Sequence, residues 1–197
     1  MLLKAAWATF WMLLFRAGPQ DFPYSPGLTR ALIAITTLIT AGLFMTLTPP
    51  VLALAFAAGV VGAVAATTWM SLKPRGLENR FQQTLAALLA VFTAHGLMLL
   101  PVFMETAPIV MKLMNDPATM EKIRQGLPVD LPVPRWAAMA SDLLFLWNFA
   151  VTLNVFRQAT GTSALRSLFI TLACAGAAFF FMLFTGFFAT LLFGVQT

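Results

Sequence analysis

The sequence predicts an all-α protein: a polytopic membrane helical bundle with five transmembrane helices and an N-terminal interfacial helix. The first reason is composition, since 60% of the 197 residues are hydrophobic and 10% are charged, against about 25% charged in an average soluble domain. The second is a set of five apolar stretches that can each cross about 30 Å of hydrocarbon. The third is the alternation of charge between the loops. The composition excludes a soluble enzyme, a disordered chain and a secreted disulfide scaffold.

The five apolar stretches are the predicted spans, and local signals mark the ends of the first. Ser25 followed by Pro26 predicts a helix start, because a hydroxyl caps the first turn and proline needs no donor there. Pro49 and Pro50 end this span, since neither can donate to a helix, and the first two spans therefore form a tight hairpin. The spans are 28–48, 51–72, 81–104, 136–157 and 167–194.

The loop charges predict the orientation. One side of the membrane receives eight basic and two acidic residues, whereas the long loop on the other side balances four of each. Cytoplasmic loops carry the excess of lysine and arginine, so the N-terminus is expected in the cytoplasm and the C-terminus outside. The eight basic residues are Lys4, Arg16, Arg30, Lys73, Arg75, Arg80, Arg157 and Arg166.

The N-terminal segment, 1–26, is predicted to be a cytoplasmic interfacial helix and a proline-rich connector, followed by the five-helix domain 27–197. Five side chains recur at helical spacing and favour the headgroup boundary; they are Trp7, Phe10, Trp11, Leu14 and Phe15. A helix packed against the bundle is the alternative. A cleaved signal peptide is disfavoured, because the triplet Ala6-Trp7-Ala8 lies inside the apolar run rather than after it.

The outer loop, 105–135, is the one long region expected outside lipid. Asp116 and Pro117 predict a cap and the first turn of a short helix that reaches about Gln125. A second short helix on the membrane surface is expected at 109–114. Residues 127–134 are expected to be an extended strap, because three prolines keep the residues before them out of the helical region. The strap would cover the outer mouth of the bundle or offer a partner an extended surface.

Three polar residues inside the spans form the candidate site: His95, Asp142 and Asn148. Ionisable groups in hydrocarbon are expensive and usually have a partner or a function. Counting from the span ends places His95 and Asp142 within roughly 3 Å in height, so they can meet if the third and fourth spans are neighbours. The pair is either a clamp that fixes helix packing or a proton or ligand site that opens outward.

No catalytic or metal-binding set is recognisable, so we expect a non-enzymatic protein without cofactors. An intramembrane aspartyl protease needs two carboxylates, and Asp142 is the only one within a span. The serine-hydrolase motif G-x-S-x-G does not occur. Cys174 and His95 differ by about 10 Å in predicted height, which is too far for a nucleophile and its base. One histidine and one cysteine cannot build an ordinary zinc site.

Small residues recur at intervals of four in two spans and permit close helix contact. They are expected to pack within the molecule or to form an oligomer. The predicted helix-packing residues are Ala58, Gly62, Ala66, Gly186 and Gly194, with Thr190 between the last two.

The connector Arg16-Ala-Gly-Pro-Gln-Asp-Phe-Pro-Tyr-Ser-Pro26, ahead of five spans, resembles small inner-membrane proteins of Gram-negative bacteria that are loosely grouped with the Yip family. The resemblance implies five spans, a cytoplasmic N-terminus and a bacterial inner (plasma) membrane. It covers only topology and this connector, and it transfers no functional residue to a position of this chain.

Two functions remain open from the sequence. The preferred hypothesis is an accessory or scaffold protein of the inner membrane, whose partners are the lipid bilayer and other membrane proteins or copies of itself, and not nucleic acid. The alternative is a small channel or proton-coupled transporter with a polar site between the third and fourth spans.

Overall fold

The computed structural model describes residues 1–128 and 132–193, and over these residues the fold is an all-α bundle without strands. Five of its helices are long and apolar enough to cross a membrane, which confirms the predicted fold class. The helices are α1 (Leu2–Leu13), α2 (Pro26–Phe44), α3 (Pro50–Leu72), α4 (Phe81–Met114), α5 (Pro117–Arg124), α6 (Arg135–Thr160) and α7 (Ala164–Phe193).

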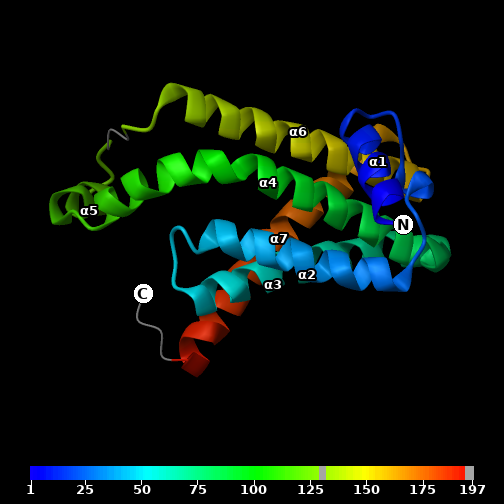
Figure 1. Cartoon of the computed structure of the whole chain (residues 1–197). Coiled ribbons are helices and arrows are strands. Elements are labelled where there is room, and N and C mark those ends of the chain that lie inside the picture. The colour runs from blue at the N-terminus through cyan, green and yellow to red at the C-terminus, as the bar shows by residue number, and fades with distance from the viewer. Residues whose placement is uncertain (129–131, 194–197) are drawn as a thin grey trace.

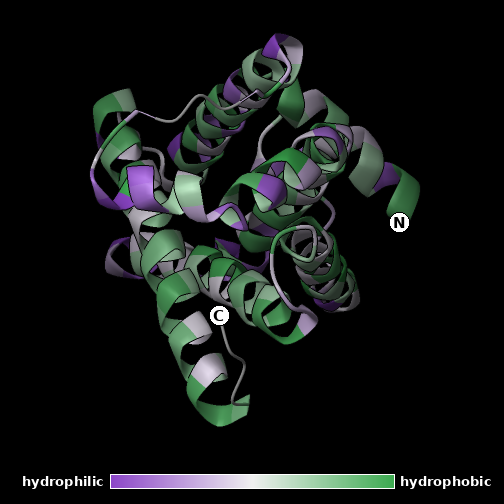
Figure 2. Cartoon of the chain, turned by 90° about the vertical axis from the view of Figure 1, so that its left-hand side faces the viewer, coloured by the Kyte–Doolittle hydropathy of each residue, from purple (hydrophilic) through white to green (hydrophobic). Residues whose placement is uncertain are grey.

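The arrangement of the long helices follows from their apolar faces. α4 packs against α2, α6 and α3, and α7 packs against α3 and α6 (Figure 1). The fully buried side chains include Leu88 and Leu89 of α4 and Phe156 of α6, together with Met12 of α1 and Phe22 of the connector. Viewed from the α5 end, α7 is hydrophobic along most of its length (Figure 2), as a lipid-facing helix requires.

The predicted start of α2 is confirmed, whereas α2 ends at Phe44, four residues before the predicted end of this span at 48. The Ser25 hydroxyl accepts a hydrogen bond from the Leu28 amide at 3.3 Å, and Pro26 is the first helical residue. α2 and α3 pack against each other as a hairpin whose second helix starts at Pro50. Because successive spans alternate in direction, all the loops that carry the basic residues named above lie at one end, here called the basic end.

The predicted end of the third span was wrong. α4 continues through Pro101 and Pro108 to Met114, so 109–114 is its last part and not a separate surface helix. Each proline removes one backbone hydrogen bond and bends a helix without always ending it, and α4 is curved in Figure 1. Its 34 residues span about 50 Å, well beyond about 30 Å of hydrocarbon.

The short outer helix α5 was predicted correctly, with its cap at Asp116. This carboxylate accepts hydrogen bonds from the amides of Ala118 and Thr119 at 3.3 and 3.2 Å and from the Thr119 hydroxyl at 2.6 Å. These bonds favour the ionised form, the hydroxyl bond most strongly, and so lower the pKa of Asp116 below its ordinary value. The capped helix leads the chain from the end of α4 back toward α6.

α1 has two unlike faces. Ala5, Ala8 and Met12 are buried against the bundle, where α1 contacts α4 and α6. Trp7 and Phe10 are 61% and 49% exposed. The helix therefore packs on the bundle by one side, as in the alternative interpretation, while its aromatic side remains free to contact the membrane interface.

Candidate functional site

The three polar residues predicted as a site lie along α4 and α6, which are neighbours. His95 is 8% exposed, and its ring meets the ring of Phe145 on α6 edge-on, with centroids 5.5 Å apart. Its Nε2 atom has no hydrogen-bond partner among the described residues. The group that faces His95 across the interface is thus an aromatic ring.

Asp142 occupies a different environment, one helical turn toward the outer end from Phe145. It is exposed and lines a cavity of about 270 Å³ together with Ser141 and Phe145 of α6 and Thr106 of α4. His95 is not among the residues that line this cavity. Phe145 therefore stands between the imidazole and the space that holds the carboxylate. Val133, from the end of the predicted strap, also lines this outer cavity.

Asn148 lies on α6 between Asp142 and the basic end, one turn before Thr152. Asn148 is half-buried and Thr152 is 3% exposed, so this side of α6 faces protein rather than lipid. The Oδ1 atom of Asn148 and the Oγ1 atom of Thr152 lack hydrogen-bond partners among the described residues. These two groups are separate polar atoms, and no hydrogen bond links them to His95 or Asp142 in the described structure.

The two small-residue stripes behave differently. In α7, a Cβ atom added to Gly186 would lie 2.2 Å from the ring of Phe56 on α3, so this glycine allows close contact within the molecule. In α3, Ala58 and Gly62 are exposed and a Cβ atom added to Gly62 would meet nothing within 4 Å. Ala66 is half-buried. Gly194 lies outside the described residues.

A glycine that the sequence pattern did not single out completes the α3–α7 contact. A Cβ atom added to Gly59 would lie 2.7 Å from both the backbone oxygen of Phe181 and the hydroxyl of Thr185. That hydroxyl also donates to the backbone oxygen of Ala55 at 2.8 Å. Gly59 lies one residue after Ala58, on the adjoining face of the same helix, and interval counting alone could not distinguish the two faces.

The connector is fixed to the basic end by three glutamine side chains. Gln83 of α4 donates to the backbone oxygens of Gln20 and Phe22, at 3.1 and 2.5 Å. Gln20 donates to the amide oxygen of Gln158 on α6 at 2.9 Å. Gly18 passes so close that an added Cβ atom would lie 1.9 Å from this same oxygen. The connector thus bridges the start of α4 and the end of α6.

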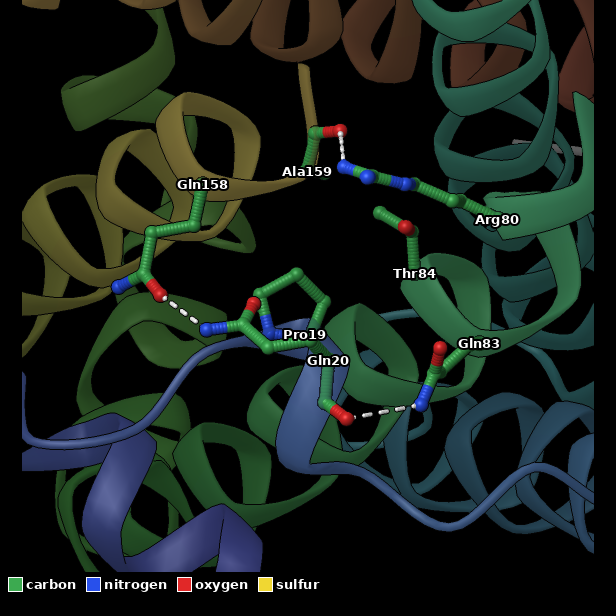
Figure 3. A pocket seen from close by; sticks show the side chains of 7 residues that line it. All are labelled: Pro19, Gln20, Arg80, Gln83, Thr84, Gln158 and Ala159. Carbon is green, nitrogen blue, oxygen red and sulfur yellow. Dashed lines mark hydrogen bonds between the residues drawn. The ribbon is translucent and has the colours of Figure 1, made fainter. Parts of the chain in front are cut away.

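These contacts border a partly open cavity of about 370 Å³, here called the basic-end cavity (Figure 3). Arg80 lies on one side of it and donates to the backbone oxygen of Ala159 at 3.3 Å. The buried Thr84 lies beside Arg80, and its side chain faces the open space. The lining residues are Pro19, Gln20, Arg80, Gln83, Thr84, Gln158 and Ala159. The sequence predicts Arg80 only as one of the charges that set the orientation, and no sequence pattern assigns these glutamines a role.

Over the described residues, no group of three histidine, cysteine, aspartate or glutamate side chains can hold a metal ion. Comparison with known proteins adds no assignment, since no family model, curated protein or solved structure matches this chain.

Proposed function

We propose that the protein is a non-enzymatic accessory or scaffold protein of the bacterial inner membrane, and that it associates with another transmembrane helix through the outward face of α3. The observation that carries this proposal is the exposure of Ala58 and Gly62 in a span. The partner helix belongs to a second copy or to another membrane protein. The expected orientation, with the N-terminus in the cytoplasm, is part of the proposal.

Helix association in lipid depends on close packing, because lipid tails are as apolar as a leucine side chain. Small residues at intervals of four allow two backbones to approach closely. Within this chain, Gly59 is used in that way against Phe181 of α7, whose backbone oxygen would lie 2.7 Å from an added Cβ atom. Gly62 also lacks a side chain that would keep a neighbouring helix away, but no residue of the described structure packs on it. An uncovered glycine in a helix costs about 0.5–1 kcal/mol relative to alanine, which a contact with a second helix would offset.

Cysteine cross-linking in native membranes tests this face. Cys174 is 3% exposed and can be replaced by serine, after which Gly62→Cys supplies a single thiol on the proposed face. We expect a specific cross-linked product, either a dimer or an adduct with one co-purifying membrane protein. Gly176→Cys on α7 is the matched control, since Gly176 is also exposed and also has open space around it. Equal cross-linking at both positions, or none at Gly62, would remove the support for this face.

Transport by a small channel or proton-coupled carrier is retained as a second candidate because of one observation: Asp142 stands in the outer cavity with the hydroxyl-bearing residues Ser141 and Thr106. A carboxylate beside such a cavity is an entry site of the kind that ion and proton pathways use. Vesicles that contain the purified chain test this candidate. Proton or cation flux that Asp142→Asn abolishes would favour transport over the scaffold proposal.

A further inference from the structure

The basic-end cavity is a partly open hollow with a buried floor, because Arg80 and Gln20 at its rim are exposed. Thr84 is 1% exposed and Ala159 is 2% exposed, and both line it. Its volume of about 370 Å³ lies within the range of about 300–1,000 Å³ that small-molecule sites occupy. Its walls come from the connector, α4, α6 and Arg80, which directly precedes α4. The glutamine contacts described above hold the connector, α4 and α6 together.

The donors that face this space suit an anion. The Arg80 guanidinium has five N–H donors and uses one of them on Ala159, so the others remain for a ligand. The Thr84 side chain lies beside Arg80 and faces the same space (Figure 3), and its hydroxyl has no hydrogen-bond partner among the lining residues. No lining residue carries a carboxylate. A guanidinium beside a hydroxyl is well matched to the oxygens of a phosphate group.

The hydrogen-bond acceptors that line the cavity indicate that the ligand also carries hydroxyl groups. Gln20 and Gln83 use their amide N–H groups in the contacts that fix the connector, which leaves the amide oxygen of each as an acceptor. An amide oxygen pairs with a hydroxyl group but not with a phosphate oxygen. The cavity therefore combines donors for phosphate with acceptors for hydroxyl groups.

The basic-end cavity lies at the end of the bundle where residues typical of the lipid headgroup region are found. Arg16 and Asp21 of the connector line a neighbouring groove together with Lys4, Trp7 and Trp11 of the N-terminal segment. The Arg16 guanidinium lies 5.4 Å from the Trp11 ring centroid. Lysine, arginine and tryptophan at a helix end are typical of the headgroup region. We propose that the basic-end cavity binds a phosphate ester that carries free hydroxyl groups, supplied either as a phosphoglycerol lipid headgroup or as free glycerol phosphate.

The proposal does not depend on association through α3, and its test needs no partner. The full-length chain in a zwitterionic detergent is titrated with phosphatidylglycerol, phosphatidylcholine, glycerol 3-phosphate and inorganic phosphate, and bound ligand is measured by native mass spectrometry. We expect phosphatidylglycerol or glycerol 3-phosphate to bind about tenfold more tightly than phosphatidylcholine or inorganic phosphate. All four ligands offer phosphate oxygens to Arg80, but only the first two carry glycerol hydroxyl groups that can donate to the amide oxygens of Gln20 and Gln83, and one or two such hydrogen bonds contribute about 1.4 kcal/mol. The arm that binds identifies whether a lipid or a soluble ester is the source.

Two variants locate the binding. Arg80→Gln should weaken it about tenfold, whereas the charge-matched control Arg75→Gln should change it less than about twofold. Arg75 lies at the same end but turns back to donate to the backbone oxygen of Ser71. Equal losses in both variants would show diffuse attraction to a basic surface and overturn the proposal, as would the absence of any preference for a hydroxylated phosphate ester.

A third variant keeps the proposal testable if Arg80→Gln does not fold. Thr84→Val replaces one hydroxyl by a methyl group of the same shape, and it should weaken binding about threefold through loss of one hydrogen bond. Unchanged binding in Thr84→Val, with the protein folded by circular dichroism, would place the ligand elsewhere and overturn the proposal.

Discussion

Trp147, near the middle of α6, donates its indole N–H to the backbone oxygen of Leu13, the last residue of α1, at 2.9 Å. The last carbonyls of a helix have no partner within that helix, so this indole supplies a donor that α1 lacks. The chain then turns at Phe15, whose φ of 60° is unusual for a residue other than glycine. After this turn, the backbone N–H of Arg16 donates to the backbone oxygen of Trp11 at 2.8 Å. Trp147 thus fixes the point where α1 ends against the bundle.

The first prediction concerns this contact. Trp147→Phe should loosen α1 from α6, because loss of one hydrogen bond costs about 1 kcal/mol. Amide hydrogen exchange at residues 5–13 should then become about fivefold faster, with little change in α2 or α3. Trp136→Phe is the matched control, since Trp136 is 53% exposed at the far end of α6. Unchanged exchange in α1 would show that its buried alanine face alone holds it in place.

The second prediction separates the two faces of α3. Gly59→Ala should destabilise the protein by about 1–3 kcal/mol, because the new methyl group meets a backbone oxygen of α7 that cannot move alone. Gly62→Ala should be neutral, or stabilising by up to about 1 kcal/mol, because that position is open. Reversible unfolding in detergent provides the comparison. Equal costs at both positions would contradict the packing of α3 on α7.

The spans were predictable because their signals are local. Apolar length, the cap at Ser25 and the proline pair at Pro49 act within a few residues of where they stand, and the corresponding helix ends lie within about four residues of the expected positions, save at the end of α4. That end was missed because Pro101 and Pro108 bend a helix but do not always end it, and nothing local shows that α4 continues beyond the hydrocarbon.

The site residues were less predictable because their roles depend on which helix face meets which neighbour. Gly62 and Gly186 follow the same spacing rule, yet one is exposed and the other is packed against Phe56. Likewise, Gln20 and Gln158 are 138 positions apart and meet only in the folded chain. Glutamine has no sequence signature for such a contact, so the basic-end cavity could not be anticipated.

The third prediction concerns orientation. Alkaline phosphatase and fluorescent-protein fusions after Gly76 and Thr160 should report the cytoplasm, and fusions after Pro117 and Thr197 should report the periplasm. The reason is the excess of lysine and arginine at the basic end, because such residues are retained in the cytoplasm. A single contrary reporter would mean that one of the five apolar helices does not cross the membrane.

The last prediction concerns His95 and Asp142. His95→Leu should raise the free energy of unfolding by about 1 kcal/mol, because a buried imidazole nitrogen without a partner is replaced by an apolar group of similar size. Asp142→Asn should change stability little, since the carboxylate is exposed in the outer cavity. In the double variant the two changes in unfolding free energy should add within about 0.5 kcal/mol, because the residue between them, Phe145, presents an apolar ring that carries no charge.

A coupling free energy well above that limit, measured by reversible unfolding at two pH values, would show that His95 and Asp142 act as one site. Together with loss of proton flux in Asp142→Asn vesicles, it would make transport the better account of these residues.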